Sequence, residues 1–77
     1  MKHTPQSIGE IVKKTRKQLG ATQKELALTS GTGLRFISEL EKGKPTCQIG
    51  KVLTVLQTLG INLSLNMPSG FNNNSKD

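Results

Sequence analysis

Few side chains in this sequence are suited to catalysis or to holding a metal ion. The 77 residues include one histidine, His3, and one cysteine, Cys47. A Ser/His/Asp or Cys/His set therefore cannot be assembled without His3, which lies next to the N-terminal end. Glu39 and Glu41 are two residues apart, so on a helix their carboxylates point in different directions and make no acid–base pair. We expect a protein that is not an enzyme and that holds no metal or other cofactor.

The charge of the chain indicates an anionic partner instead. Eleven Lys and Arg residues stand against five Asp and Glu residues, which gives a formal net charge of +6. In so small a domain this charge favours partners such as nucleic acid or an acidic membrane surface. No apolar run approaches the about 18 residues that a membrane span needs, and no secretory signal pattern is present. Cys47 is expected to be a half-buried apolar residue in a reducing cytosol.

The most specific spacing lies in the centre of the chain. Ala27 is small, as a residue must be where two helices cross closely, and Gly31 follows four residues later in a turn that needs unusual dihedral angles. Ile37, six residues further on, is placed to bury against the first helix of the pair. Two short helices joined by a short glycine turn form a helix-turn-helix. The outer side of the second helix then carries Leu34, Arg35, Ser38, Glu39 and Lys42.

This central stretch resembles the Xre/Cro-type helix-turn-helix of phage repressors, and the resemblance covers about residues 8–60. The residues that carry it occur together in one register: Thr22-Gln23, Leu26-Ala27, Gly31, Ile37-Ser38, Leu40-Glu41 and Gly43. The continuation is similar to the HipB-type branch, through Gly43-Lys44-Pro45-Thr46, Lys51-Val52-Leu53 and Leu59-Gly60 before a single strand. Proteins of that branch are antitoxins that bind operator DNA as dimers and hold a HipA-type serine/threonine kinase toxin.

The resemblance implies a mainly α fold, a four- to five-helix lambda-repressor-like helix-turn-helix domain with one C-terminal β-strand that pairs across a dimer. It implies a sequence-specific transcriptional repressor of the bacterial cytoplasm and nucleoid, which is the antitoxin of a HipA-type kinase and autoregulates its operon. Two alternatives stay open. One is a solitary phage-type or metabolic Xre-family repressor without a toxin. The other is a protein-interaction module that has lost DNA binding, against which Gln23, Arg35 and the charge of +6 count.

Carried over by position, the DNA contacts of the family fall on the helix-turn-helix. Arg35 is the best candidate for base reading, because a guanidinium pairs bidentately with guanine. Leu34 suits a thymine methyl group, and Glu39 suits a cytosine amino group. Gln23 is expected to anchor a phosphate, as are residues that flank the recognition helix. The full set expected at the DNA is Gln23, Lys24, Thr32, Leu34, Arg35, Ser38, Glu39, Lys42 and Lys44.

Several residues have a purely structural interpretation beside the functional one. Glu39 could equally tie down a nearby Lys or Arg, and Leu34 could belong to the core. Phe36 is expected to be half-buried. Arg16 and Glu41 match family positions that form a structural ion pair. These two are assigned to the scaffold together with Ala27, Gly31 and Ile37, whereas Lys13, Lys14 and Lys17 are expected to form a solvated helix face.

Capping signals predict the first two helices. Residues 1–6 are expected to form a short arm, and a DNA-binding domain is expected over residues 7–60. Ser7, with Glu10 three residues later, predicts a capping box and a helix over about 8–19. Thr22 and Glu25 predict a second capping box and a helix over about 23–29.

Two further helices follow. Thr32 is expected to cap a helix over about 33–42, which would be the recognition helix. Thr46 or Cys47 is expected to start a fourth helix, which Gly60 ends. Gly50 inside that helix costs about 1 kcal/mol relative to Ala, and close helix packing would explain it.

The period of the sequence changes after Gly60. Residues 61–67 alternate strictly between apolar and polar, which predicts a half-buried strand. Because a lone strand leaves its backbone groups unpaired, its cheapest partner is the same strand of a second copy, antiparallel about a two-fold axis. Only 32% of the residues are hydrophobic, so this pairing would supply burial that the small core lacks. The dimerisation residues are Ile61, Leu63, Leu65 and Met67, and residues 68–77 are expected to form a flexible tail.

Overall fold

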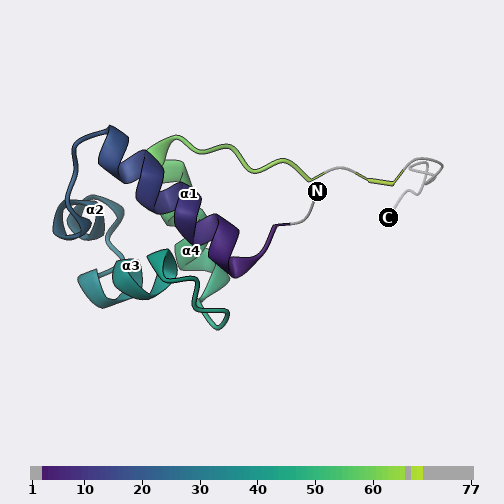
Figure 1. The fold of residues 1–77 in the computed structure, drawn as a ribbon, viewed down its shortest axis with the longest axis horizontal. Helices are drawn as coiled ribbons and strands as arrows, with labels where there is room; N and C mark the ends of the chain where they lie inside the picture. The colour runs from purple at the N-terminus through teal and green to yellow at the C-terminus, as the bar shows by residue number, and fades with distance from the viewer. Residues whose placement is uncertain (1–2, 66, 69–77) are drawn as a thin grey trace.

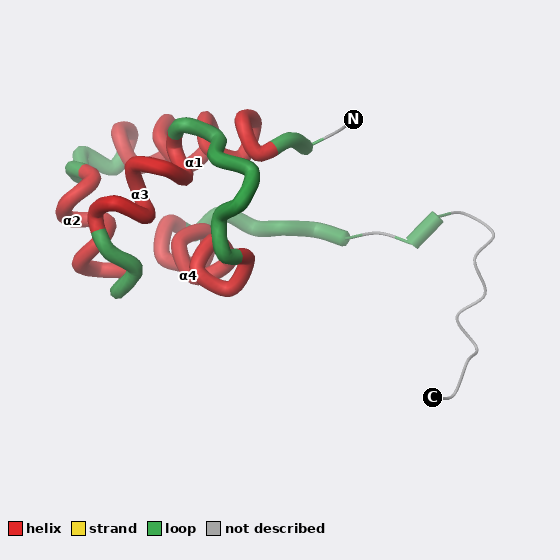
Figure 2. The backbone as a smooth tube through the Cα atoms, turned by 90° about the horizontal axis from the view of Figure 1, so that it is seen from below, coloured by secondary structure: helices red, strands yellow, loops and turns green. Residues whose placement is uncertain are grey.

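The computed structural model describes residues 3–65, 67 and 68, and the part of the chain that it describes contains four helices (Figure 1). These are α1 (Pro5–Gln18), α2 (Gln23–Ser30), α3 (Leu34–Glu41) and α4 (Ile49–Leu59). Both α1 and α2 pack against α3 and α4, and Figure 2 shows α4 across the base of the bundle. The mainly α, helix-turn-helix architecture is therefore confirmed. None of the described helices is long and apolar enough to cross a membrane.

The first helix begins earlier than its sequence signals predicted. Thr4, and not Ser7, is the N-cap, and Pro5 occupies the first helical position, where its missing N–H costs no hydrogen bond. The Thr4 hydroxyl accepts a hydrogen bond from the Ser7 backbone N–H at 3.0 Å, and the Ser7 hydroxyl accepts one from the Thr4 N–H at 2.8 Å. Ser7 is thus the third helical residue of the capping box, the place that the sequence analysis assigned to Glu10.

The capping box of α2 is confirmed. The Thr22 hydroxyl accepts from the Glu25 N–H at 3.0 Å, and the Glu25 carboxylate accepts from the Thr22 N–H at 2.8 Å. Gly31 ends the helix with φ 70°, the left-handed conformation that favours glycine. Its N–H donates to the Ala27 carbonyl at 2.9 Å, which closes the last turn.

The expected cap of α3 was wrong. Gly33 is the N-cap, with φ 98° and no side-chain hydrogen bond, and the helix begins at Leu34. The Thr32 hydroxyl lies 2.8 Å from the Ser30 hydroxyl instead, because the turn keeps these two residues together. The start of α4 is also later than expected: Gln48 is its N-cap, and Gly60 ends it as predicted.

The core lies where the four helices meet. Ala27 and Ile37 are both buried, as their scaffold assignment requires. Phe36 is half-buried as expected, and the ammonium group of Lys51 on α4 lies 5.8 Å from the centre of its ring. Cys47 is half-buried and packs against the core. The buried apolar residues are Val12, Leu26, Ala27, Ile37, Leu40, Val52, Val55 and Leu56.

Gly9 permits a close approach that the sequence analysis did not foresee. A Cβ atom at Gly9 would overlap the carbonyl oxygen of Leu40 and would lie 2.9 Å from that of Glu41, so α1 touches the last turn of α3. At Gly50 a Cβ atom would meet nothing within 4 Å. Close packing within the described chain therefore does not explain Gly50.

Gly9→Ala is expected to lower the free energy of unfolding by about 1–2 kcal/mol, because the cost of overpacking exceeds the gain in helix propensity. Gly50→Ala is the matched control. It is expected to stabilise the protein by about 0.5–1 kcal/mol, because its new methyl group has room. Urea unfolding at one fixed protein concentration measures both variants. A Gly9→Ala variant as stable as Gly50→Ala would show that α1 and α3 do not touch in this way.

The segment that follows α4 leaves the bundle on the side where α1 begins (Figures 1 and 2). Ile61 packs back against the core, whereas 47% of Leu63 and 87% of Leu65 are exposed to solvent. The described residues 61–65, 67 and 68 carry no strand within the single chain. Pairing with a second copy therefore stays a prediction. Asn66 and the expected tail at residues 69–77 lie outside the described residues.

Candidate nucleic-acid interface

The turn between α2 and α3 fixes these two helices as one unit. The N–H groups of Gly31 and Thr32 both donate to the carbonyl of Ala27, at 2.9 and 3.2 Å. Leu26 and Ala27 of α2 and Ile37 of α3 are buried on the inner side of this unit. The opposite side of α3 consequently faces solvent, as a recognition helix requires.

The outer side of α3 presents the residues that were expected to read bases. The Arg35 side chain is 91% exposed. Leu34 is 51% exposed, so the interpretation of Leu34 as a core residue was wrong. Ser38 and Glu39 are half-buried beside them, and Lys42 is exposed just after the helix.

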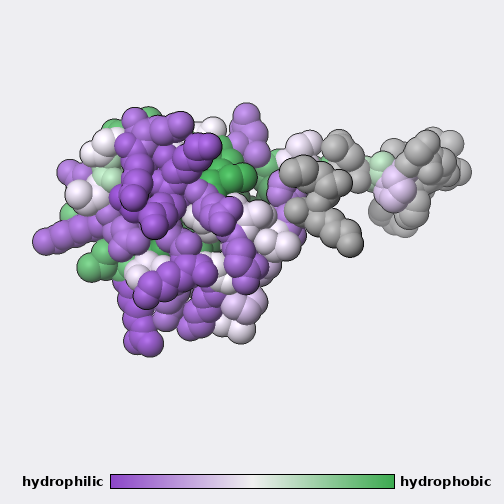
Figure 3. All heavy atoms as spheres, viewed as in Figure 1, coloured by the Kyte–Doolittle hydropathy of each residue, from purple (hydrophilic) through white to green (hydrophobic). Residues whose placement is uncertain are grey.

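Residues expected at phosphates surround this face. Lys24 and Lys44 are exposed, and Thr32 and Gln23 are half-buried. The three lysines of α1, Lys13, Lys14 and Lys17, are exposed as predicted. Figure 3 shows hydrophilic side chains over most of the visible face of the bundle, with apolar surface beside the segment that follows α4.

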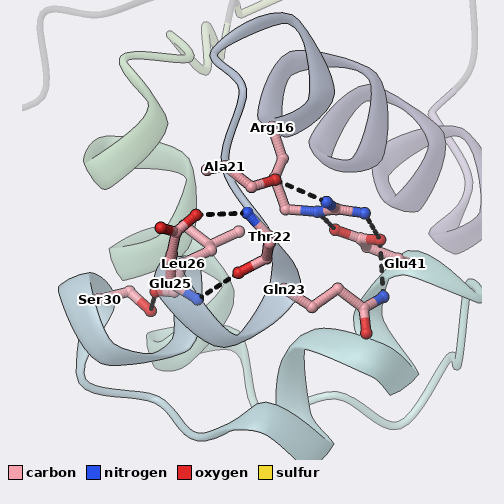
Figure 4. Close-up of polar contacts among 8 residues, drawn as sticks. All are labelled: Arg16, Ala21, Thr22, Gln23, Glu25, Leu26, Ser30 and Glu41. Carbon is pink, nitrogen blue, oxygen red and sulfur yellow. Dashed lines mark hydrogen bonds and ion pairs between the residues drawn. The ribbon is translucent and has the colours of Figure 1, made fainter.

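The ion pair that the resemblance implied lies at the end of α3, and it is confirmed (Figure 4). The Arg16 guanidinium donates to both Glu41 carboxylate oxygens, from Nε at 2.6 Å and from Nη2 at 3.0 Å. Its Nη1 donates to the carbonyl of Ala21 at 2.8 Å. The two side chains are 9% and 3% exposed, so the pair joins α1 to the end of α3 in a largely dry environment.

Gln23 belongs to this scaffold as well, which the sequence analysis missed. Its side-chain amide nitrogen donates to Oε1 of Glu41 at 2.9 Å (Figure 4). This bond ties the first residue of α2 to the last residue of α3. A phosphate contact from Gln23 stays a prediction beside this structural role. Gln23 and Glu41 are 18 positions apart in the sequence, so no local spacing indicated their hydrogen bond.

The environment of Glu41 keeps its carboxyl group ionised. Burial alone would raise the pKa of Glu41. The hydrogen bonds from Arg16 and Gln23, with the positive charges of Arg16 and Lys13, outweigh that effect and hold the pKa below its ordinary value. The hydrogen bond to Glu41 in turn raises the pKa of Arg16, against a smaller opposing effect of burial. Both groups are therefore charged at neutral pH.

A second, wetter cluster of charges lies on the outer side. Oε2 of Glu39 is 3.3 Å from Nε of Arg35 and 3.2 Å from Nζ of Lys44. The hydrogen bond from Lys44, supported by the charge of Lys44 and by Arg35, lowers the pKa of Glu39 in spite of some desolvation. Of the two interpretations of Glu39, the described chain thus shows the tie to nearby cations, and a base contact stays a prediction.

Comparisons with known proteins agree with this geometry. A model of the helix-turn-helix domain matches residues 9–67. An uncharacterised HTH-type transcriptional regulator, y4mF of Sinorhizobium fredii, is 55% identical over 65 residues, which are 84% of this chain and 86% of that protein. A second uncharacterised HTH-type regulator, from Haemophilus influenzae, is 39% identical over 66% of this chain and 52% of its own length.

Solved structures of HipB superpose on the chain. A HipB–O4 20mer complex and a HipA–HipB–O2–O3 complex each give a TM-score of 0.77 at 27% identity. Each match covers 87% of this chain and 94% of the compared chain. The similarity therefore extends over nearly the whole of both chains.

Proposed function

The chain belongs to the Xre-type helix-turn-helix family of transcriptional regulators, and on that premise we propose that it is a sequence-specific repressor that binds operator DNA as a homodimer. In this proposal α3 enters the major groove, the usual place of the second helix of such a motif. The protein is further proposed to be the antitoxin of a HipA-type kinase, to repress its own operon and to work in the bacterial cytoplasm on the nucleoid.

The observation that carries the DNA-binding proposal is the outer side of α3. The Arg35 side chain is 91% exposed there on a helix whose other side is buried, and the buried Arg16–Glu41 pair holds the end of that helix in place. Arg35 and Leu34 are proposed to meet base edges, and Glu39 and Ser38 to lie beside them. Contacts that position the duplex without reading it are assigned to Gln23, Lys24, Thr32, Lys42 and Lys44.

The segment that follows α4 supports the dimer. It exposes Leu63, Leu65 and Met67, although Ile61 at its start packs on the core. A second copy that pairs with this segment would cover these side chains and satisfy its backbone groups. The same pairing would fix the distance between two recognition helices, which must reach major grooves about 34 Å apart.

The kinase partner rests on the similarity to HipB and on the HipA–HipB–O2–O3 complex among the similar structures. In this proposal the chain restrains the kinase by holding one conformation or domain arrangement, rather than by chemistry of its own. A solitary repressor is the competing function. Affinity purification from the native host distinguishes the two, because only an antitoxin recovers a kinase.

Arg35→Ala is expected to cost about 1–3 kcal/mol of operator binding and to relax the preference at one base pair of each half-site, because bidentate contacts to guanine are lost. Lys44→Ala is the control for a phosphate contact, and it should weaken binding to all sequences alike. Fluorescence titration against the DNA upstream of this gene, and against variants of it at each base pair, measures both. An Arg35→Ala protein with unchanged sequence preference would refute the assignment of Arg35. If the wild type binds neither the upstream DNA nor its variants, the alternative of a protein-interaction module that has lost DNA binding is favoured.

A further inference from the structure

Glu39 forms ion pairs with two basic side chains, Arg35 and Lys44, that the proposed DNA binding uses. Its Oε2 atom contacts the guanidinium of Arg35, the proposed base reader, and the ammonium group of Lys44, a proposed phosphate contact. Lys44 is also fixed through its backbone, because its N–H donates to the carbonyl of Glu39 at 3.1 Å. The carboxylate therefore neutralises positive charge at the centre of the face that would meet the duplex.

Stability offers little reason for a carboxylate at this position. Ion pairs of exposed side chains contribute little to folding, and the Arg35 side chain is 91% exposed. Glu39 lies near the C-terminal end of α3, where the helix dipole disfavours a negative charge. The order Arg35 before Glu39 is also the weaker order for such a pair on a helix.

Glu41, two residues later, shows what a structural glutamate looks like in the same helix. Its side chain is 3% exposed and is held by Arg16 and Gln23, whereas the Glu39 side chain is 31% exposed and faces the solvent side. The two glutamates thus have different roles, and Glu39 is the one that faces the proposed DNA surface.

We propose that Glu39 is a specificity-determining residue that suppresses binding to DNA of the wrong sequence, a role that rests on the proposed DNA-binding function. On a random duplex, Arg35 and Lys44 must leave Glu39 for phosphates, and the carboxylate is left facing phosphates and base acceptors that repel it. On the operator, a base that presents an amino group, such as cytosine, gives the carboxylate a new partner while Arg35 pairs with guanine. The repulsion between the Glu39 carboxylate and the DNA is therefore offset only at the correct sequence.

The test compares Glu39→Gln with wild type on two duplexes, the DNA upstream of this gene and a random sequence of equal length, over a series of salt concentrations. Glutamine keeps the size of the side chain and removes its charge. Affinity for the random duplex is expected to rise by about three- to tenfold. The slope of log affinity against log salt concentration should become steeper by about one released counterion. Affinity for the operator should rise less or fall, so that the ratio of the two affinities drops.

Glu10→Gln is the matched control, because it makes the same change in net charge at an exposed position on α1. If Glu39 acted only as one negative charge among others, both variants would gain affinity for both duplexes alike, and the proposal would be overturned. An unchanged ratio in Glu39→Gln would overturn it too. A wild-type protein that binds neither duplex would instead refute the proposed function, and this inference with it.

A double-mutant cycle tests whether Glu39 restrains Lys44. If Glu39 restrains Lys44, then Lys44→Ala should cost more affinity for the random duplex in the Glu39→Gln background than in the wild type. Equal costs in the two backgrounds would contradict the restraint. Urea unfolding of each variant shows whether α3 remains folded.

Discussion

Removal of every residue after Gly60 is expected to turn a dimer into a monomer and to weaken operator binding by about 10²-fold or more. The expectation follows from the segment that leaves α4, in which 87% of Leu65 and 52% of Met67 are exposed in the single chain. Two linked recognition helices bind two half-sites with an effective concentration that a monomer loses. Sedimentation at several protein concentrations, and titration of a palindromic operator, measure the two effects.

A truncation after Pro68 is the matched control, since it keeps the proposed strand and should remain a dimer. A full-length protein with Leu63→Glu and Leu65→Glu should dissociate like the shorter truncation, because both charges would lie on the apolar face of the paired strands. A tight dimer in the protein that ends at Gly60 would contradict the strand pairing and would place the interface on α4 alone.

Glu41→Gln is expected to lower the free energy of unfolding by about 3–5 kcal/mol. Arg16 is buried, and the substitution leaves its guanidinium without a counter-charge and with weaker hydrogen bonds. Glu25→Gln removes a carboxylate from an exposed capping box and should cost far less. Urea unfolding at one protein concentration compares the two, and equal losses would show that the buried pair has no special role.

The pH dependence of the free energy of unfolding gives an independent check of the Arg16–Glu41 pair. Because the folded protein holds the pKa of Glu41 below the ordinary value of 4.5, this group stabilises the fold above that pH. The stabilisation is lost as the pH falls through the lowered pKa of the folded state. Wild type should therefore lose stability below about pH 4.5, and Glu41→Gln should lose less over the same range. An equal loss of stability in wild type and Glu41→Gln over this pH range would contradict the assignment of this effect to Glu41.

Capping residues in the sequence predicted those helix starts that depend on interactions between neighbouring residues. Thr22 and Glu25 are three residues apart in the sequence and form the capping box that this spacing indicates. At the start of α1 two such signals compete, and Thr4 followed by Pro5 caps the helix in preference to Ser7. The order and type of the four helices and the start of α2 could thus be predicted, whereas the first residues of α1, α3 and α4 could not.

Contacts between distant residues had no signal in the spacing. Arg16 and Glu41 are 25 residues apart, and only the family resemblance indicated their pairing. The approach of Gly9 to the end of α3 also depends on how two helices cross, which no single segment determines. The tie between Glu39 and Lys44 passes through the turn at Gly43, outside any helical spacing, so the sequence analysis could only offer it as one of two interpretations.

Methylation interference on the DNA upstream of this gene can show whether α3 reads bases in the major groove. A methyl group on guanine N7 lies in the major groove, and one on adenine N3 lies in the minor groove. We expect guanine N7 methylation to block binding at matching positions in two half-sites, with one position in each half-site becoming insensitive in Arg35→Ala. Interference from adenine N3 methylation alone would contradict binding of α3 in the major groove. The same guanine pattern in Arg35→Ala as in the wild type would contradict base reading by Arg35.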